Sequence, residues 1–203
     1  YLLAGLVKKN NIVYVAKNDL ELLAVSNFIS NSFPDINIYS IPSWDCLPYD
    51  ISSPNYNIIS ERIKTFTNLS FSNETSSNNN LFLTTINGLL IKTAPKDFYL
   101  SNFLKINNSN ENSFKNINDF LNNVVYNRVQ TVRELGEFSI RGSILDIFPI
   151  GYDHAVRIDF LGEKIETIKK MDPLTQRSGE VLNFVNIYLP NEYLLNEKTI
   201  ENF

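Results

Sequence analysis

Two arginines on neighbouring predicted β-strands carry the chemistry that stands out first in this sequence. Arg141 and Arg157 lie in apolar-rich runs, 138–150 and 155–161, which a turn-type tetrapeptide at 151–154 separates. Such runs around a turn predict antiparallel strands. A guanidinium is a planar fork of donors that grips a carboxylate through two hydrogen bonds. The faces on which these forks lie therefore decide what they can bind.

Pairing the two strands about the middle of the turn predicts which side chains share a face. Arg141 then lies opposite Leu161, and Arg157 lies opposite Leu145. All four share one face, because side chains two or four apart on a strand point the same way. The same face takes Ser139, Ser143 and Asp159, and the opposite face, the expected core side, takes Ile140, Ile144, Asp146, Phe148, Val156, Ile158 and Phe160.

This pairing predicts a partner-binding set in which two guanidiniums lie beside two exposed aliphatic side chains that exclude water. Its members are Arg141, Arg157, Leu161, Leu145 and Asp159. A register slip of one residue would divide the arginines between the two faces. A β-bulge at Gly142 would do the same.

Plainer interpretations of these and other polar residues stay open. The arginines could be surface residues paired with Asp159 or other acids, and the two leucines could pack under a helix. Further candidates are a magnesium site at Glu137, Asp146 and Asp159, base stacking by Trp44 and Tyr49, a solvent-exposed His154, and Cys46 as a poor nucleophile candidate. No phosphate-loop motif occurs within residues 1–203.

Composition excludes several classes of protein. The net charge of −4 and the pI near 5.1 argue against a domain that holds nucleic-acid phosphates by bulk electrostatics. No run approaches 18 apolar residues, so no membrane span is predicted. The single cysteine excludes an internal disulfide and suits a reducing cytoplasm. No signal peptide is predicted at the start of the sequence, and the chain is expected to be a piece of a longer protein.

The order of predicted elements indicates two domains. Strands are expected at 11–16, 36–41 and 81–86, with helices from Asn18 and around 58–69 between them, which is typical of a parallel α/β layer. Near residue 95 the pattern changes to α+β, with alternation at 97–106, a short helix around 117–125, and then an antiparallel meander whose third strand is 164–169. The predicted domains are 1–95 and 96–189, with 190–203 returning to the first.

Two ordered motifs make the sequence similar to the bacterial transcription-repair coupling factors over roughly residues 36–190. They comprise Trp44-Asp-Cys-Leu-Pro-Tyr-Asp50, Ser53-Pro54 and 58–62 in the first domain, and 136–149, 157–160, Glu166 and Asp172-Pro-Leu-Thr-Gln-Arg177 in the second. The second domain also resembles one in the excinuclease protein UvrB. UvrB, however, has a long hairpin insertion where the Trp44 loop here leads almost directly into the helix at Ile58.

The resemblance implies a fold and a partner. The fold would be a degenerate helicase-type parallel α/β domain, without a working ATPase or a bound cofactor, into which an α+β domain is inserted. The inserted domain would bind the excinuclease protein UvrA through Arg141, Arg157 and Leu161, the last of which is commonly aromatic in the family. The fragment would thus recruit nucleotide excision repair without catalysis.

Other roles implied by the resemblance belong to parts of the parent protein that are absent here. There, an ATP- and magnesium-dependent DNA translocase would act on RNA polymerase and double-stranded DNA in the cytoplasm, with no membrane involved. Two alternatives remain. One is a fragment of the excinuclease protein UvrB, which recognises DNA damage with ATP. The other is a module that binds DNA directly through the Trp44–Tyr49 loop.

Overall fold

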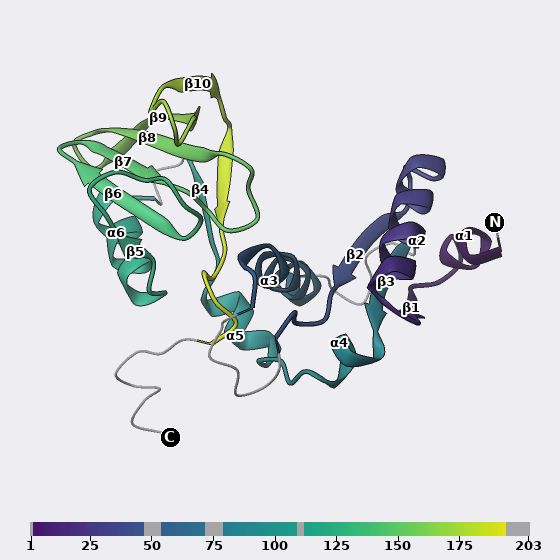
Figure 1. Ribbon diagram of the computed structural model, residues 1–203. Helices are drawn as coiled ribbons and strands as arrows, with labels where there is room; N and C mark the ends of the chain where they lie inside the picture. Colours follow the sequence, from purple (N-terminus) through teal and green to yellow (C-terminus); the bar gives the residue numbers. More distant parts are fainter. Residues whose placement is uncertain (1, 47–53, 72–78, 109–111, 194–203) are drawn as a thin grey trace. The chain divides into compact units, whose positions relative to one another are not determined.

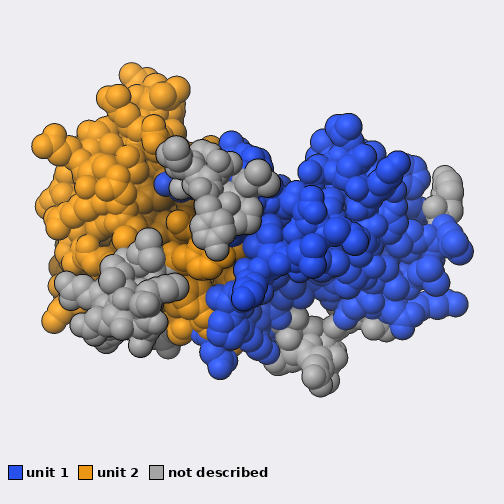
Figure 2. Space-filling model, turned by 60° about the horizontal axis from the view of Figure 1, so that its bottom comes forward, with its two compact units in different colours: residues 1–97 blue, residues 98–203 orange. Residues whose placement is uncertain are grey.

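The computed structural model describes residues 2–46, 54–71, 79–108 and 112–193. The chain divides into two compact units, residues 1–97 and residues 98–203, coloured blue and orange in Figure 2. Each unit has its own sheet (Figure 1). The predicted return of residues 190–203 to the first domain falls largely on residues outside the described ranges. Residues 190–193 group with the second unit.

The first unit is a parallel α/β layer, as its predicted order of strands and helices indicates. Its three-stranded sheet has the order β1-β3-β2, and both pairings are parallel. The elements are α1 (Leu2–Val7), β1 (Ile12–Ala16), α2 (Asp19–Ser32), β2 (Asn37–Ile41), α3 (Tyr56–Phe71), β3 (Asn80–Thr85) and α4 (Ile86–Leu90), and α5 (Lys96–Ser101) spans the boundary between the units.

Local chemistry accounts for these elements. The Asn18 side chain caps α2 by accepting a hydrogen bond from the Glu21 amide at 2.9 Å. The central strand β3 is the most buried, and its Leu81 and Leu83 pack in one core cluster with Leu22 and Ile29 of α2. A central parallel strand is buried on both faces, which explains the apolar run in this part of the sequence.

The second unit is built around a six-stranded sheet of order β10-β9-β8-β7-β6-β5 (Figure 1). Neighbours from β6 to β10 pair antiparallel, and β5 pairs parallel with β6. The strands are β5 (Asn127–Arg128), β6 (Glu137–Arg141), β7 (Ile144–Ile147), β8 (Ala155–Leu161), β9 (Lys164–Met171) and β10 (Ser178–Val181). A two-stranded sheet of β4 (Leu104–Asn107) and β11 (Phe184–Ile187), and the helix α6 (Phe114–Asn123), complete the unit.

The predicted strand at 138–150 is wrong, because it is two strands. β6 and β7 form a hairpin in which Arg141 pairs with Ile144, so that Gly142 and Ser143 are a two-residue turn. Gly142 has φ +61°, the left-handed conformation that such turns require and that glycine adopts without strain. The predicted alternation at 97–106 is also wrong over its first half, which is helical in α5.

The register between β7 and β8 also differs from the predicted one. Arg157 pairs with Asp146, whereas pairing about the middle of the 151–154 turn predicts Leu145 opposite it. Leu145 instead pairs with Ile140 and Ile158 and is 0% exposed. The prediction that Leu145 is exposed beside the arginines is therefore wrong, and so is the prediction that Asp146 lies on the core side.

Both faces of the sheet contribute to the core, but unequally. One face carries Leu145, Ile158 and Phe160, and the Phe160 ring contacts Phe114 of α6 with ring centroids 5.1 Å apart. The other face is covered near the start of β8 by a cluster of Val132, Ala155 and Met171, packed with Val129 and Phe148. Toward the end of β8 this second face is exposed. No helix in the described ranges is long and apolar enough to cross a membrane.

The turn at Gly142 leads to a prediction about stability. Replacing Gly142 with alanine forces a Cβ atom into the left-handed region, which costs about 1–2 kcal/mol, although nothing lies within 4 Å to clash with that atom. Gly179→Ala is the matched control, because Gly179 lies in β10 of the same unit and has no positive φ. Urea unfolding should show a lower free energy of unfolding than the wild type for Gly142→Ala and not for Gly179→Ala. Equal values for the two variants would contradict a strained turn at Gly142.

Candidate partner-binding site

Five side chains from three consecutive strands form the candidate site, here called the arginine face: Arg141, Asp146, Arg157, Asp159 and Leu161. Asp146 pairs across the sheet with Ser139 on one side and with Arg157 on the other. Directly opposed residues in an antiparallel sheet share a face, and residues 157, 159 and 161 share one by alternation. Arg141 joins this face because its partner Ile144 also pairs with Asp159.

The Asp146 carboxylate lies at the centre of the arginine face. Its side chain is 1% exposed. Arg157 grips it with two hydrogen bonds, Nε to Oδ1 at 2.6 Å and Nη2 to Oδ2 at 2.9 Å. Arg141 also donates from Nη2 to Oδ2. A buried charge is tolerated when it is paired and hydrogen-bonded, and here both oxygens are used.

Arg157 is held by more than Asp146. Its Nη1 lies 3.3 Å from both the Gln176 carbonyl and the Ser178 hydroxyl, and its Nη2 lies 3.2 Å from the Met171 sulfur. The hydrogen bonds to Asp146 raise the pKa of Arg157 above its ordinary value, because they stabilise the charged form. With its side chain only 16% exposed, Arg157 is built into the unit.

Arg141 and Leu161 are the parts of the arginine face that are available to another molecule. The Arg141 side chain is 49% exposed, and Leu161 is 75% exposed. Leu161 ends β8 just before a second two-residue turn, in which Gly162 has φ +62°. An exposed guanidinium and an exposed aliphatic side chain on one rigid sheet can bind a carboxylate beside an apolar group.

Asp159 has its own partners on the same face. Its Oδ2 accepts hydrogen bonds from the Thr167 hydroxyl at 2.7 Å and from Lys169 Nζ at 3.0 Å. Partial burial opposes ionisation, but the hydrogen bonds from Thr167 and Lys169 outweigh it and lower the pKa of Asp159. The alternative interpretation, in which the arginines pair with Asp159 or other acids, is confirmed for another acid, because both arginines pair with Asp146. Asp159 itself forms its ion pair with Lys169.

Sequence reasoning missed the role of Asp146. The signal available was a lone carboxylate in an otherwise apolar run, which must find a cationic partner if it is buried. It also did not predict the contact between the 172–177 motif and Arg157. There the Gln176 side chain donates to the Val132 carbonyl at 2.9 Å, and Gln176 has φ +60°. This loop supplies the carbonyl that meets Arg157.

The other sequence candidates do not assemble into a site. The Glu137 carboxylate accepts the Arg133 and Glu134 amides at 2.8 and 2.9 Å, which gives it a role in a turn. Among the described residues no group of His, Cys, Asp and Glu is arranged to hold a metal ion. Trp44 and Cys46 are partly buried. Tyr49 lies outside the described ranges.

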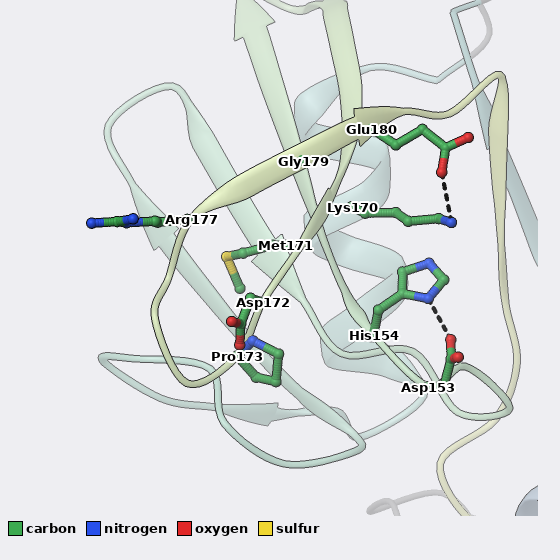
Figure 3. Close-up of a pocket in the computed structure, with 9 residues that line it drawn as sticks. All are labelled: Asp153, His154, Lys170, Met171, Asp172, Pro173, Arg177, Gly179 and Glu180. Carbon is green, nitrogen blue, oxygen red and sulfur yellow. Dashed lines mark hydrogen bonds and ion pairs between the residues drawn. The ribbon is translucent and has the colours of Figure 1, made fainter.

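His154 lines a shallow pocket of about 390 Å³ between the turn at 153–154, β9, the 172–177 loop and β10 (Figure 3). Its ring is 24% exposed, so the prediction of a solvent-exposed histidine is only partly right. In the pocket acids and bases pair with each other, His154 Nδ1 with Asp153 Oδ1 at 2.5 Å and Lys170 Nζ with Glu180 Oε2 at 2.8 Å (Figure 3).

The known proteins to which the chain is similar are of one kind. Residues 104–193, within the second unit, match the UvrB interaction domain family. The chain is similar to the transcription-repair-coupling factor of Rickettsia bellii, with 35% identity over 96% of the chain, and to that of Rickettsia typhi, with 40% over 82%. Identity to the factor of Escherichia coli is 28% over 95% of the chain.

These relatives are much longer than the chain, which spans 17%, 14% and 16% of their respective lengths. The match nevertheless covers both units, since more than nine tenths of the chain aligns with two of them. The chain therefore belongs to the transcription-repair-coupling factor family, as a module of that family with a UvrB interaction domain at residues 104–193.

Proposed function

We propose that this module recruits nucleotide excision repair by binding the excinuclease protein UvrA through the arginine face. In this role the second unit does no chemistry; it presents Arg141 and Leu161 to the partner. The family membership supports a role in DNA repair coupled to transcription. The net charge of −4 over the whole chain favours a protein partner over nucleic acid.

The observation that carries the proposal is that the Arg141 guanidinium is half exposed and yet held in place. Ordering a long side chain on binding costs about 0.5–1.5 kcal/mol. The hydrogen bond to the buried Asp146 carboxylate imposes part of that order before the partner arrives. Leu161, 75% exposed on the same face, can then exclude water around a salt bridge between Arg141 and a partner carboxylate.

We place the remaining functions of the parent in other parts of its chain. The first unit, with its three parallel strands, suits a degenerate helicase-type domain that scaffolds the second. ATP, magnesium, RNA polymerase and double-stranded DNA would be bound by the segments of the relatives that this chain does not span. Recruitment would then follow the arrest of a polymerase, with the module as the adaptor.

Removing Arg141 tests the proposal. Arg141→Ala should weaken binding of the chain to purified UvrA by about 30-fold, which is about 2 kcal/mol and typical of an interface hot spot. Isothermal titration calorimetry measures it. The matched control is Arg128→Ala, which removes the same charge from an exposed position in β5 at the edge of the same sheet. An equal loss in both variants would indicate bulk charge and contradict a specific face, and no binding by the wild type would contradict the proposed function.

A second prediction is that a change at Leu161 tightens binding to UvrA. Leu161→Phe restores an aromatic ring that can stack on a guanidinium of the partner, worth about 0.5–1 kcal/mol at an exposed site, or a two- to fivefold gain in affinity. The melting temperature should not change, because Leu161 is exposed. Leu20→Phe makes the same change at an exposed leucine of the first unit and should leave affinity unaltered. Weaker binding by Leu161→Phe would show that the ring does not fit.

A further inference from the structure

The two arginines of the candidate site are not equivalent. All three nitrogens of the Arg157 guanidinium group donate within the unit, to Asp146, to the Gln176 carbonyl, to the Ser178 hydroxyl and to the Met171 sulfur. Its side chain is 16% exposed. Little of this guanidinium remains for a partner, and any partner that took its donors would have to break existing hydrogen bonds.

Arg141 is in the opposite situation. Within the described residues its guanidinium donates to one acceptor, Asp146 Oδ2, from Nη2. Half of the side chain is exposed, and the bond to Asp146 uses one of the two hydrogens on Nη2. A bidentate contact with a carboxylate uses Nη2 together with either Nη1 or Nε, and the second hydrogen of Nη2 lets Arg141 form one without losing its bond to Asp146.

The charges of the arginine face also favour Arg141 as the group that binds a partner carboxylate. The two guanidiniums share the one Asp146 carboxylate, while Asp159 pairs separately with Lys169. One positive charge therefore remains unmatched in the arginine network. It resides on the exposed side, because Arg157 holds both carboxylate oxygens from the buried side. A single partner carboxylate would complete the balance.

We propose that Asp146 is a positioning residue for partner binding, with Arg157 as its support, and that, of the two arginines, only Arg141 meets the partner, through one carboxylate of that protein. The inference rests on the proposed function for the identity of the partner. The ordering of the Arg141 side chain by Asp146 does not depend on any partner. In this arrangement the effect of Arg157 on binding is indirect, transmitted by the orientation of the Asp146 carboxylate.

The first experiment needs no partner. Hindered rotation of a hydrogen-bonded guanidinium gives separate NMR signals for Nη1 and Nη2, whereas free rotation averages them. In the ¹⁵N-labelled 203-residue chain, we expect separate signals for Arg141 in the wild type and averaged signals in Asp146→Asn. Averaged signals in the wild type, or separate signals retained in Asp146→Asn, would overturn the positioning role.

A second variant is used if Asp146→Asn does not fold. Asp146→Asn leaves two guanidiniums without their carboxylate, and its thermal unfolding is therefore measured first. If it does not fold, Arg157→Lys replaces it: lysine keeps the charge but cannot hold both oxygens of Asp146. The carboxylate then loses its fixed orientation, and the Arg141 signals should average. Separate signals in a folded Arg157→Lys variant would overturn the role of Arg157 as support.

The second experiment is a double-mutant cycle for binding to UvrA. We expect Asp146→Asn and Arg141→Ala each to weaken binding at least about tenfold, and the double variant to bind no more weakly than Arg141→Ala alone. Losses that multiply would mean that Asp146 acts independently of Arg141 and would overturn the proposal. A wild type that does not bind contradicts the proposed function, while the NMR signals still decide the positioning role.

Discussion

The second unit depends on one constraint, the burial of the Asp146 carboxylate between two guanidiniums. A buried charge is tolerated only when both its oxygens find donors, and here the donors come from the strands on either side, Arg141 of β6 and Arg157 of β8. The arrangement requires the strand order β6-β7-β8 and the register that places Asp146 opposite Arg157. Through Arg157 the same carboxylate is linked to the 172–177 loop, whose Gln176 carbonyl accepts another hydrogen bond.

The sheet divides its faces between stability and recognition. The face with Leu145, Ile158 and Phe160 is buried, and it includes the contact between Phe160 and Phe114 of α6. The arginine face is covered near Ala155 by the cluster with Val132 and Met171 and opens toward Leu161. Exposed groups thus lie on a rigid element whose opposite side is core. This suits a binding surface, because little order has to be imposed when the partner arrives.

The two short turns make this arrangement possible. Gly142 and Gly162 both have φ near +60° and begin two-residue turns, one at the end of β6 and one at the end of β8. They place Arg141 and Leu161 next to tight reversals of the chain, where side chains are less covered by neighbours. The exposure of these residues on the sheet, 49% and 75%, follows from that position.

The sequence by itself determined most of the first unit and the family. Asn18 and Glu21 indicate the start of α2, and the apolar runs at 11–16, 36–41 and 81–86 predict the parallel strands, because these signals are local. Only the tertiary structure decided the arginine face. Pairing the strands about the middle of the 151–154 turn placed Leu145 on the face of Arg157 and Asp146 on the opposite face, whereas the observed pairing of β7 with β8 is shifted by one residue and exchanges them. Arg141 and Arg157 still share a face, because the turn at Gly142 and the one-residue change in the pairing of β7 with β8 offset each other. Strand alternation has a period of two residues, so a shift of one residue moves every side chain of a strand to the other face. The register is certain only when the cross-strand partners are known.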